Sequence, residues 1–131
     1  MDNSSKGANV SSHYDVIIIG AGLAGLSVAR GLKGIDSVLL IDKIPIGSKY
    51  NPPHETLLEY IEQIGYGRAV VQRFNTMDIR TSTGSYTMKF FKPHCTLDYV
   101  KLCELIWNRS DAEFRLVTAK PIDNKSIMID G

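Results

Sequence analysis

The strongest chemical signal in the sequence is a cluster of glycines near the N-terminus. Gly20, Gly22 and Gly25 form a G-x-G-x-x-G pattern. Glycine leaves room for a phosphate to approach the backbone, and a helix that begins at this turn points its positive end at the anion. The pattern therefore predicts that backbone N–H groups around Leu23 and Ala24 bind the pyrophosphate of a dinucleotide.

An acidic residue stands where such a site needs one, because Asp42 follows Gly20 by 22 positions and ends an apolar run. In dinucleotide-binding units an acid at this place accepts hydrogen bonds from the adenosine ribose hydroxyls. An acid also disfavours a 2′-phosphate, so NADP is the poorer candidate for the main ligand. Lys43 follows directly and is a cation that can approach a phosphate. FAD and NAD share this fingerprint.

The elements that must position these residues are read from hydrophobic periodicity. The continuous β-branched run 15–19 predicts a strand buried on both faces of a parallel sheet. Helical spacing follows over 23–33, and 38–41 is a second continuous apolar strand. Strand, helix and strand make one βαβ unit. The expected fold class is α/β, a Rossmann-like FAD/NAD(P)-binding fold with a parallel sheet.

After Asp42 the chain leaves this sheet for a long excursion. The expected elements are a loop over 44–53, a helix over 55–64, a hairpin of strands 77–80 and 86–90, a helix over 98–108 capped by Asp98, and strands over 114–119 and 126–129. Only the strand over 114–119 can return to the sheet. Two-domain flavoproteins build a substrate domain between their second and third strands in this way, so the excursion favours FAD and the start of a β-rich substrate domain.

Composition excludes several classes of function. The chain has 15 Lys plus Arg against 14 Asp plus Glu, and this balance supplies no basic field for nucleic acid. The uncharged run 16–29 is too short and too rich in glycine to be a transmembrane segment. Residues 1–13 are expected to be a disordered leader. Two cysteines without a secretion signal indicate reduced thiols and a cytoplasmic protein.

Other side chains that could do chemistry are better explained by structure. His54 is expected to be an exposed residue at the start of a helix. Cys95, next to a histidine, and Cys103, on an apolar helix face, are expected to be buried structural thiols, because no third ligand is spaced for a metal. The large aromatic side chains of Trp107 and of residues 90–91 are expected to pack in the core. The alternative is that they line an apolar substrate pocket.

Residues 15–29 and 38–43 resemble the FAD-binding N-terminus of the geranylgeranyl reductase and aromatic-hydroxylase-like superfamily. The resemblance runs loosely onward, and only its first 30 residues are specific. Two departures stand out. Tyr99 occupies the position where the family has a flavin-contacting arginine, and 50–53 replaces a Cys-Gly pair. The family's second FAD motif, a Gly-Asp pair, is expected beyond residue 131.

The resemblance implies the N-terminal part of an FAD-dependent oxidoreductase, with NAD(P)H as a candidate electron donor. Reduction of prenyl double bonds in isoprenoid lipids is the first expectation, with a small-molecule, isoprenoid or lipid substrate and peripheral membrane contact. A flavin monooxygenase or carotenoid cyclase of the same superfamily is the alternative, and a non-catalytic dinucleotide-binding module is the alternative of a different class. Residues 14–131 would form an FAD-binding domain incomplete at its C-terminus, with 50–95 as part of an inserted substrate segment.

Overall fold

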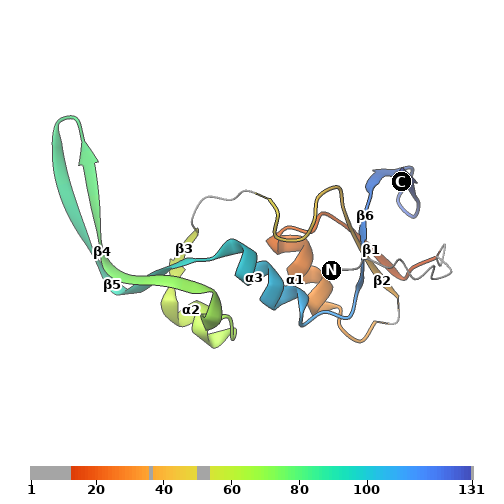
Figure 1. The fold of residues 1–131 in the computed structure, drawn as a ribbon, viewed down its shortest axis with the longest axis horizontal. Coiled ribbons are helices and arrows are strands. Elements are labelled where there is room, and N and C mark those ends of the chain that lie inside the picture. The colour runs from red at the N-terminus through yellow and green to blue at the C-terminus, as the bar shows by residue number, and fades with distance from the viewer. Residues whose placement is uncertain (1–12, 36, 50–53, 131) are drawn as a thin grey trace, which may run out of the picture.

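The computed structural model describes residues 13–35, 37–49 and 54–130, which form two three-stranded sheets, one two-stranded sheet and the helices between them (Figure 1). The strands are β1 (Val16–Ile19), β2 (Val38–Asp42), β3 (His54–Leu57), β4 (Val70–Thr81), β5 (Gly84–Leu97), β6 (Glu113–Leu116), β7 (Thr118–Pro121) and β8 (Ile127–Asp130). The helices are α1 (Leu23–Gly31), α2 (Leu58–Gln63) and α3 (Tyr99–Trp107), with a short 3₁₀ turn over Gly67–Ala69. The molecule is elongated, and the β4–β5 ribbon projects away from the helices at one end.

The first sheet is parallel and has the order β1-β2-β6. Strand β1 pairs with β2 from Val16 opposite Val38, and β2 pairs with β6 from Leu39 opposite Glu113. This arrangement confirms the βαβ unit and the return of the chain after its excursion. It also aligns the carboxyl ends of three strands at one edge, where open α/β sheets bind ligands.

Burial differs between the two strands that the sequence predicts to be alike. In β2 the residues Val38 to Ile41 are all buried. In β1, Val16 to Ile18 are half-buried and Ile19 is 51% exposed, so the expectation of burial on both faces is wrong for this strand. The reason is position, because β2 lies between two neighbours whereas β1 is at the edge of the described sheet.

Helix α1 anchors the core beside this sheet. Leu26 and Ala29 are completely buried, and they join one apolar cluster with Leu40 of β2 and Leu102 of α3. The helix ends at Gly31, two residues earlier than predicted. Because α1 contacts β1, β2 and α3, packing of this face fixes the glycine-rich turn at its start.

The second sheet is antiparallel, with the order β3-β5-β4. The predicted helix over 55–64 is wrong in its first part, because residues 54–57 form strand β3 and only Leu58–Gln63 are helical. Strand β3 pairs with the end of β5, with His54 opposite Leu97. Pairing with a distant strand overrides the local helical spacing of the leucines.

The predicted hairpin is present but much longer than its expected strands. Pairing runs from Thr81 opposite Gly84 at the tip to Val70 opposite Leu97 at the base, with irregularities after Val70 and Phe74. The predicted strands covered only the part near the tip. Polar residues and Pro93 hid the rest, because exposed strands tolerate them.

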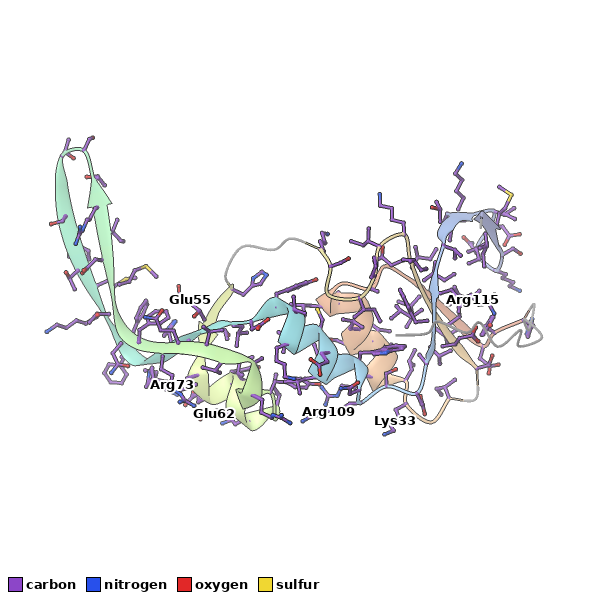
Figure 2. The ribbon with its side chains drawn as sticks, in the orientation of Figure 1. Lys33, Glu55, Glu62, Arg73, Arg109 and Arg115 are labelled. Carbon is purple, nitrogen blue, oxygen red and sulfur yellow. The ribbon has the colours of Figure 1, made fainter. Side chains whose placement is uncertain are left out.

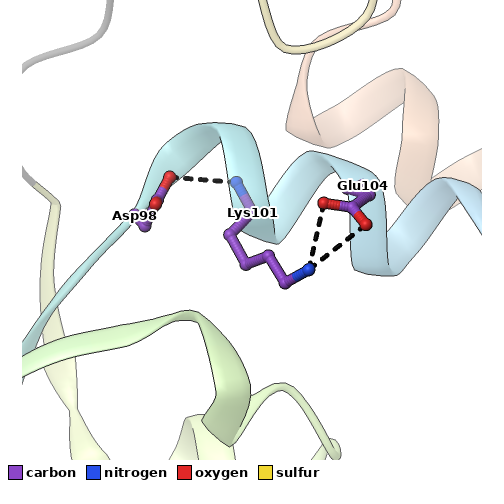
Figure 3. Close-up of polar contacts among 3 residues, drawn as sticks. All are labelled: Asp98, Lys101 and Glu104. Atoms are coloured by element: carbon purple, nitrogen blue, oxygen red, sulfur yellow. Dashed lines mark hydrogen bonds and ion pairs between the residues drawn. The ribbon is translucent and has the colours of Figure 1, made fainter.

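Helix α3 confirms the prediction for 98–108 almost in full. The Asp98 carboxylate accepts a hydrogen bond of 2.9 Å from the backbone N–H of Lys101, as an N-cap does (Figure 3). The Lys101 ammonium also pairs with Glu104 one turn later. The buried face of the helix contains Tyr99, Leu102, Cys103 and Ile106.

The chain after α3 forms two short strands where the sequence predicts one. Strand β6 ends at Leu116, and the Val117 N–H donates to the Asp42 carbonyl before β7 begins at Thr118. Strand β7 then pairs with β8 as a separate hairpin, with Thr118 opposite Asp130. The predicted strand over 114–119 is therefore divided between two sheets.

Candidate functional site

Two of the three motif glycines are required by the fold itself. Gly20 has a φ of +106°, a conformation that side chains rarely adopt. A Cβ on Gly25 would overlap the Gly20 carbonyl oxygen and would also contact Ile18. Gly25 therefore lets α1 pack directly on the end of β1, as its place in the motif predicts.

Gly22 is different, because nothing in the described structure requires a glycine there. Its φ of −77° and ψ of −176° are open to any residue. A Cβ would meet only the Tyr99 hydroxyl oxygen, 4.0 Å away. The space in front of Gly22 is therefore open, and the missing side chain serves something other than the packing of the chain.

This open space lies at the N-terminus of α1. No side chain caps the helix at Gly22, and its first turn contains no acidic residue. The first main-chain bond of the helix runs from the Leu26 N–H to the Gly22 carbonyl. The N–H groups of Leu23 and Ala24 precede that bond and have no partner within the helix, so they present partial positive charge to an anion.

Asp42 connects the end of β2 to this turn. Its Oδ2 accepts a 2.7 Å hydrogen bond from the Ala21 N–H, and its Oδ1 accepts one of 3.2 Å from the Ile44 N–H. The carboxylate is half-buried and each oxygen retains a further lone pair for a ligand hydroxyl. The side chain of Lys43 next to it is exposed.

A cavity of about 160 Å³ lies at the carboxyl ends of the parallel strands. Its lining comes from three segments: Ile19 and Gly20, then Ile41 to Lys43, then Val117 to Ala119. A cavity of about 150 Å³ accepts a single benzene ring, so this one has room for a ring-sized group. Residues 117–119 were missed from the sequence, although the rule that ligands bind at strand ends could have indicated them.

Tyr99 lies near the same turn, and His54 lies beside Tyr99. Tyr99 is 9% exposed, and the ring of His54 lies 6.1 Å from its ring, centre to centre. The Nε2 atom of His54 is buried and has no hydrogen-bond partner among the residues that the structure describes. The expectation of an exposed residue at a helix start is wrong, because His54 opens a strand that pairs with β5.

The two thiols are structural, as predicted. Cys95 and Cys103 are both buried and unbonded to each other. Burial raises the pKa of both, and a hydrogen bond with Tyr99 partly offsets this rise in the pKa of Cys103. Across residues 13–35, 37–49 and 54–130 no group of three or more His, Cys, Asp or Glu is placed to hold a metal.

The aromatic residues that the sequence predicts to be in the core differ in their burial. Trp107 packs against the core and meets the ring of Phe114 edge-on at 6.2 Å, as expected. Phe91 is fully exposed, so the prediction of core packing is wrong for it, because successive side chains of β5 face opposite sides and Phe91 faces solvent whereas Phe90 is half-buried. In the described part of the chain no helix is long and apolar enough to span a membrane.

Comparison with known proteins finds flavin-dependent enzymes among the proteins that this chain resembles. No protein-family model matches the chain. Ubiquinone hydroxylase UbiM from Neisseria meningitidis serogroup C is 36% identical over 74 residues, which are 56% of this chain and 16% of that protein. The chain thus spans a small part of the length of this relative.

Solved structures show the same fold. Flavin-dependent brominase Bmp2 is 21% identical with a TM-score of 0.63, covering 86% of this chain and 31% of its own. Halogenase PltM in complex with phloroglucinol and FAD is 15% identical with a TM-score of 0.65, covering 89% and 31%. PqsL from P. aeruginosa in complex with 2-aminobenzoylacetate is 14% identical with a TM-score of 0.67, covering 88% and 37%. The chain has a mixed α/β fold with a parallel sheet that resembles the FAD-binding part of flavin enzymes.

Proposed function

We propose that this chain binds FAD and is the N-terminal part of an FAD-dependent oxidoreductase of the monooxygenase type. The observation that carries the proposal is Gly22. Its backbone is ordinary and its surroundings are open, so a closely bound phosphate explains its lack of a side chain where the fold does not. The uncapped start of α1 beside it supplies the matching positive charge.

The residues present fit the adenosine half of FAD. The N–H groups of Leu23 and Ala24 would hold the pyrophosphate, and Asp42 would accept hydrogen bonds from the ribose. The cavity over residues 117–119 would take the adenine ring. Lys43 would add a positive charge at the rim. When bound, FAD supplies the redox chemistry, and the protein's part is to hold and orient it.

Hydroxylation or a related oxidation of an aromatic ring is a better proposal than prenyl reduction. The relative by sequence is a ubiquinone hydroxylase, and the structural neighbours include halogenases, one of them in complex with FAD and the phenol phloroglucinol. The substrate class we propose is a small aromatic molecule, with NAD(P)H as electron donor.

The domain arrangement belongs to the same proposal. Residues 14–131 would form a Rossmann-like FAD-binding unit, with 50–95 as part of an inserted substrate-domain segment. The separate antiparallel sheet β3-β5-β4 supports this division. The buried free thiols Cys95 and Cys103 support a reducing, cytoplasmic location.

Calorimetric titration of the chain with ADP tests the cofactor site, because ADP contains the part of FAD that these residues would hold. Gly22→Val should weaken ADP binding by about 1–3 kcal/mol, since a branched side chain would occupy the phosphate position. Gly84→Ala, at another glycine with nothing near its added Cβ, is the control. Unchanged ADP affinity in a folded Gly22→Val protein contradicts the proposal.

The chain alone is expected to be inactive, so the reaction class is tested on the longer protein of which it would be the N-terminal part, with FAD added and an oxygen electrode. A monooxygenase consumes oxygen when NAD(P)H and an aromatic substrate are supplied together. Anaerobic oxidation of NAD(P)H that depends on a prenyl substrate would instead support reduction and overturn the monooxygenase assignment.

A further inference from the structure

A second cavity lies beside helix α3. Its volume is about 340 Å³, and it is lined by Ile46, Val100, Glu104, Trp107 and Phe114. The cavity at the carboxyl ends of the parallel strands is lined by other residues. Pockets that bind small molecules have volumes from about 300 Å³ upward, with apolar and aromatic walls and a few polar groups. We name this second space the Trp107 cavity.

One wall of the Trp107 cavity is a row of residues along α3. Val100, Glu104 and Trp107 follow one another at intervals of four and three positions, so they are neighbours on one side of the helix. The residues of α3 that are buried in the core are others: Tyr99, Leu102, Cys103 and Ile106. Val100 is 59% exposed. A row outside the core is ordinarily polar, so its apolar residues are available to a ligand.

The loop after β2 supplies the facing wall through Ile46. Its neighbour Gly47 has a φ of +77°, and a Cβ there would lie 3.5 Å from Val100. The loop is therefore packed directly on α3. The Ser48 hydroxyl and the Ser48 N–H both donate to the Pro45 carbonyl, at 2.6 Å and 3.1 Å, and hold the loop in a turn. The wall that contains Ile46 is thus fixed in place.

Two aromatic rings line the Trp107 cavity together. The Trp107 indole meets the Phe114 ring of β6 edge-on, with centres 6.2 Å apart and planes 71° apart. Both side chains are only partly buried, so each keeps some ring surface open. The face of an indole ring attracts a cation more strongly than any other aromatic side chain does.

Among the five lining residues, Glu104 carries the charge. Both of its carboxylate oxygens accept from Lys101 Nζ, at 3.2 Å and 3.1 Å (Figure 3). Strong bonds between an ammonium and a carboxylate are shorter, about 2.7–2.9 Å. The Glu104 side chain is 53% exposed, and exposed pairs of this kind contribute little to stability. Lys101 therefore holds the carboxylate weakly, and another ammonium can replace it.

We propose that the Trp107 cavity binds a small organic ammonium ion with an apolar body. Glu104 and Trp107 are three positions apart, and the Cβ atoms of such helical neighbours are about 5–6 Å apart, so one ammonium reaches both. It donates to the Glu104 carboxylate in place of Lys101 and lies against the indole. The apolar body contacts Ile46, Val100 and Phe114. The inference goes beyond the proposed function, because no residue of the cofactor site takes part in it.

Fluorescence tests the proposal directly, because Trp107 is the one tryptophan of the sequence. The full chain is titrated at pH 7 and constant ionic strength with 2-phenylethylamine and with 2-phenylethanol, which has a hydroxyl in place of the ammonium. The amine should bind about fivefold more tightly, because the indole and the carboxylate both favour positive charge. Equal affinities for the two probes, or no saturable change in Trp107 fluorescence with the amine, overturn the proposal.

Two variants should act in opposite directions on the amine alone. Glu104→Gln keeps the shape of the side chain and removes its charge, so it should lower the affinity for the amine to that for the alcohol. Lys101→Gln removes the competing ammonium and should tighten amine binding about threefold. It leaves the helix cap intact, because Asp98 bonds to the Lys101 backbone N–H. A Lys101→Gln chain that binds the amine no more tightly contradicts the displacement of Lys101.

Lys92→Gln is the matched control. It makes the same change in charge on strand β5, where Lys92 pairs with Glu59. It should leave both affinities unchanged, and equal tightening of amine binding in this variant would show a general charge effect and overturn the proposal. Self-association is the competing explanation for the open cavity. Trp107 fluorescence that changes with protein concentration, and that the amine does not reverse, would show a second copy seated there and would also overturn it.

Discussion

Gly25 lies against the backbone carbonyl of Gly20, so that the first turn of α1 rests on the end of β1. A Cβ at Gly25 would stand 3.0 Å from the Gly20 carbonyl carbon and would overlap its oxygen. Both are backbone atoms, so the helix itself must move. We expect Gly25→Ala to lower the free energy of unfolding by about 1–3 kcal/mol, measured by urea denaturation. Gly31→Ala, on the same helix with nothing near its added Cβ, should not lower it.

Asp42 should have separable roles in stability and in ligand binding. Asp42→Asn loses one of two backbone acceptors and the negative charge offered to the ribose. We expect ADP binding to weaken by about 1–3 kcal/mol, the range for a charge-assisted hydrogen bond. Inorganic pyrophosphate, which has no ribose, is the matched probe and should bind the variant and the original chain alike. An equal loss for both ligands would mean that Asp42 acts only through the shape of the turn.

Arg109 follows α3 and is hydrogen-bonded to the loop after α2. Its guanidinium donates to the carbonyl oxygens of Ile64 at 3.0 Å and Gly65 at 2.7 Å, and lies 4.4 Å from the centre of the Tyr66 ring (Figure 2). Arg109→Gln should reduce the free energy of unfolding by about 1–3 kcal/mol, because two bonds to carbonyls and a ring contact are lost together. The exposed Arg80 on the ribbon is the control, since Arg80→Gln should leave thermal unfolding unchanged.

Acid should weaken the junction of β6 with the chain before β1. The Arg115 guanidinium hydrogen-bonds to Glu113 and holds the pKa of that carboxyl below its ordinary value of 4.5, and the Tyr14 hydroxyl acts in the same direction. This stabilisation is present above pH 4.5 and is lost as the pH falls through the lowered pKa. The effect is small because the carboxyl is half exposed. Glu113→Gln should flatten the dependence of stability on pH below 4.5, and an unchanged profile would contradict the assignment.

Both thiols should react slowly in the folded chain. Burial raises the pKa of Cys95 and Cys103, which keeps the reactive thiolate scarce at neutral pH. Iodoacetamide should modify neither at an appreciable rate without urea and both once the chain is unfolded. Rapid modification of one thiol in the native protein would show local opening at that site.

The sequence alone predicts the elements whose formation depends on residues close together in the chain. The glycine motif, the central strand β2 and helix α3 with its Asp98 cap were all predicted, since each depends on neighbours along the chain. Strand β3 was not, because its four residues are extended by pairing with β5, some 40 positions away along the sequence.

The parts of the candidate site that were missed depend on the same kind of distance. Residues 117–119 line the cavity because β6 pairs with β2, and Tyr99 faces Gly22 because α3 packs on α1. No periodicity contains this information. The motif itself predicts a tight turn at Gly20 and close helix packing at Gly25, and the structure shows both.

The pairing of β6 with β2 also constrains how the chain must fold. Asp42 and Glu113 are 71 positions apart, and the two strands cannot pair until this long segment is brought round. The β4–β5 ribbon closes over a two-residue turn and can form within about 10 μs, whereas parallel pairing across so long a loop is slow. We therefore expect the ribbon to form early and the cavity at the carboxyl ends of the parallel strands, part of whose lining follows β6, to be among the last features assembled. Slow refolding would then be seen as delayed recovery of ADP binding after the ribbon's circular dichroism has already returned.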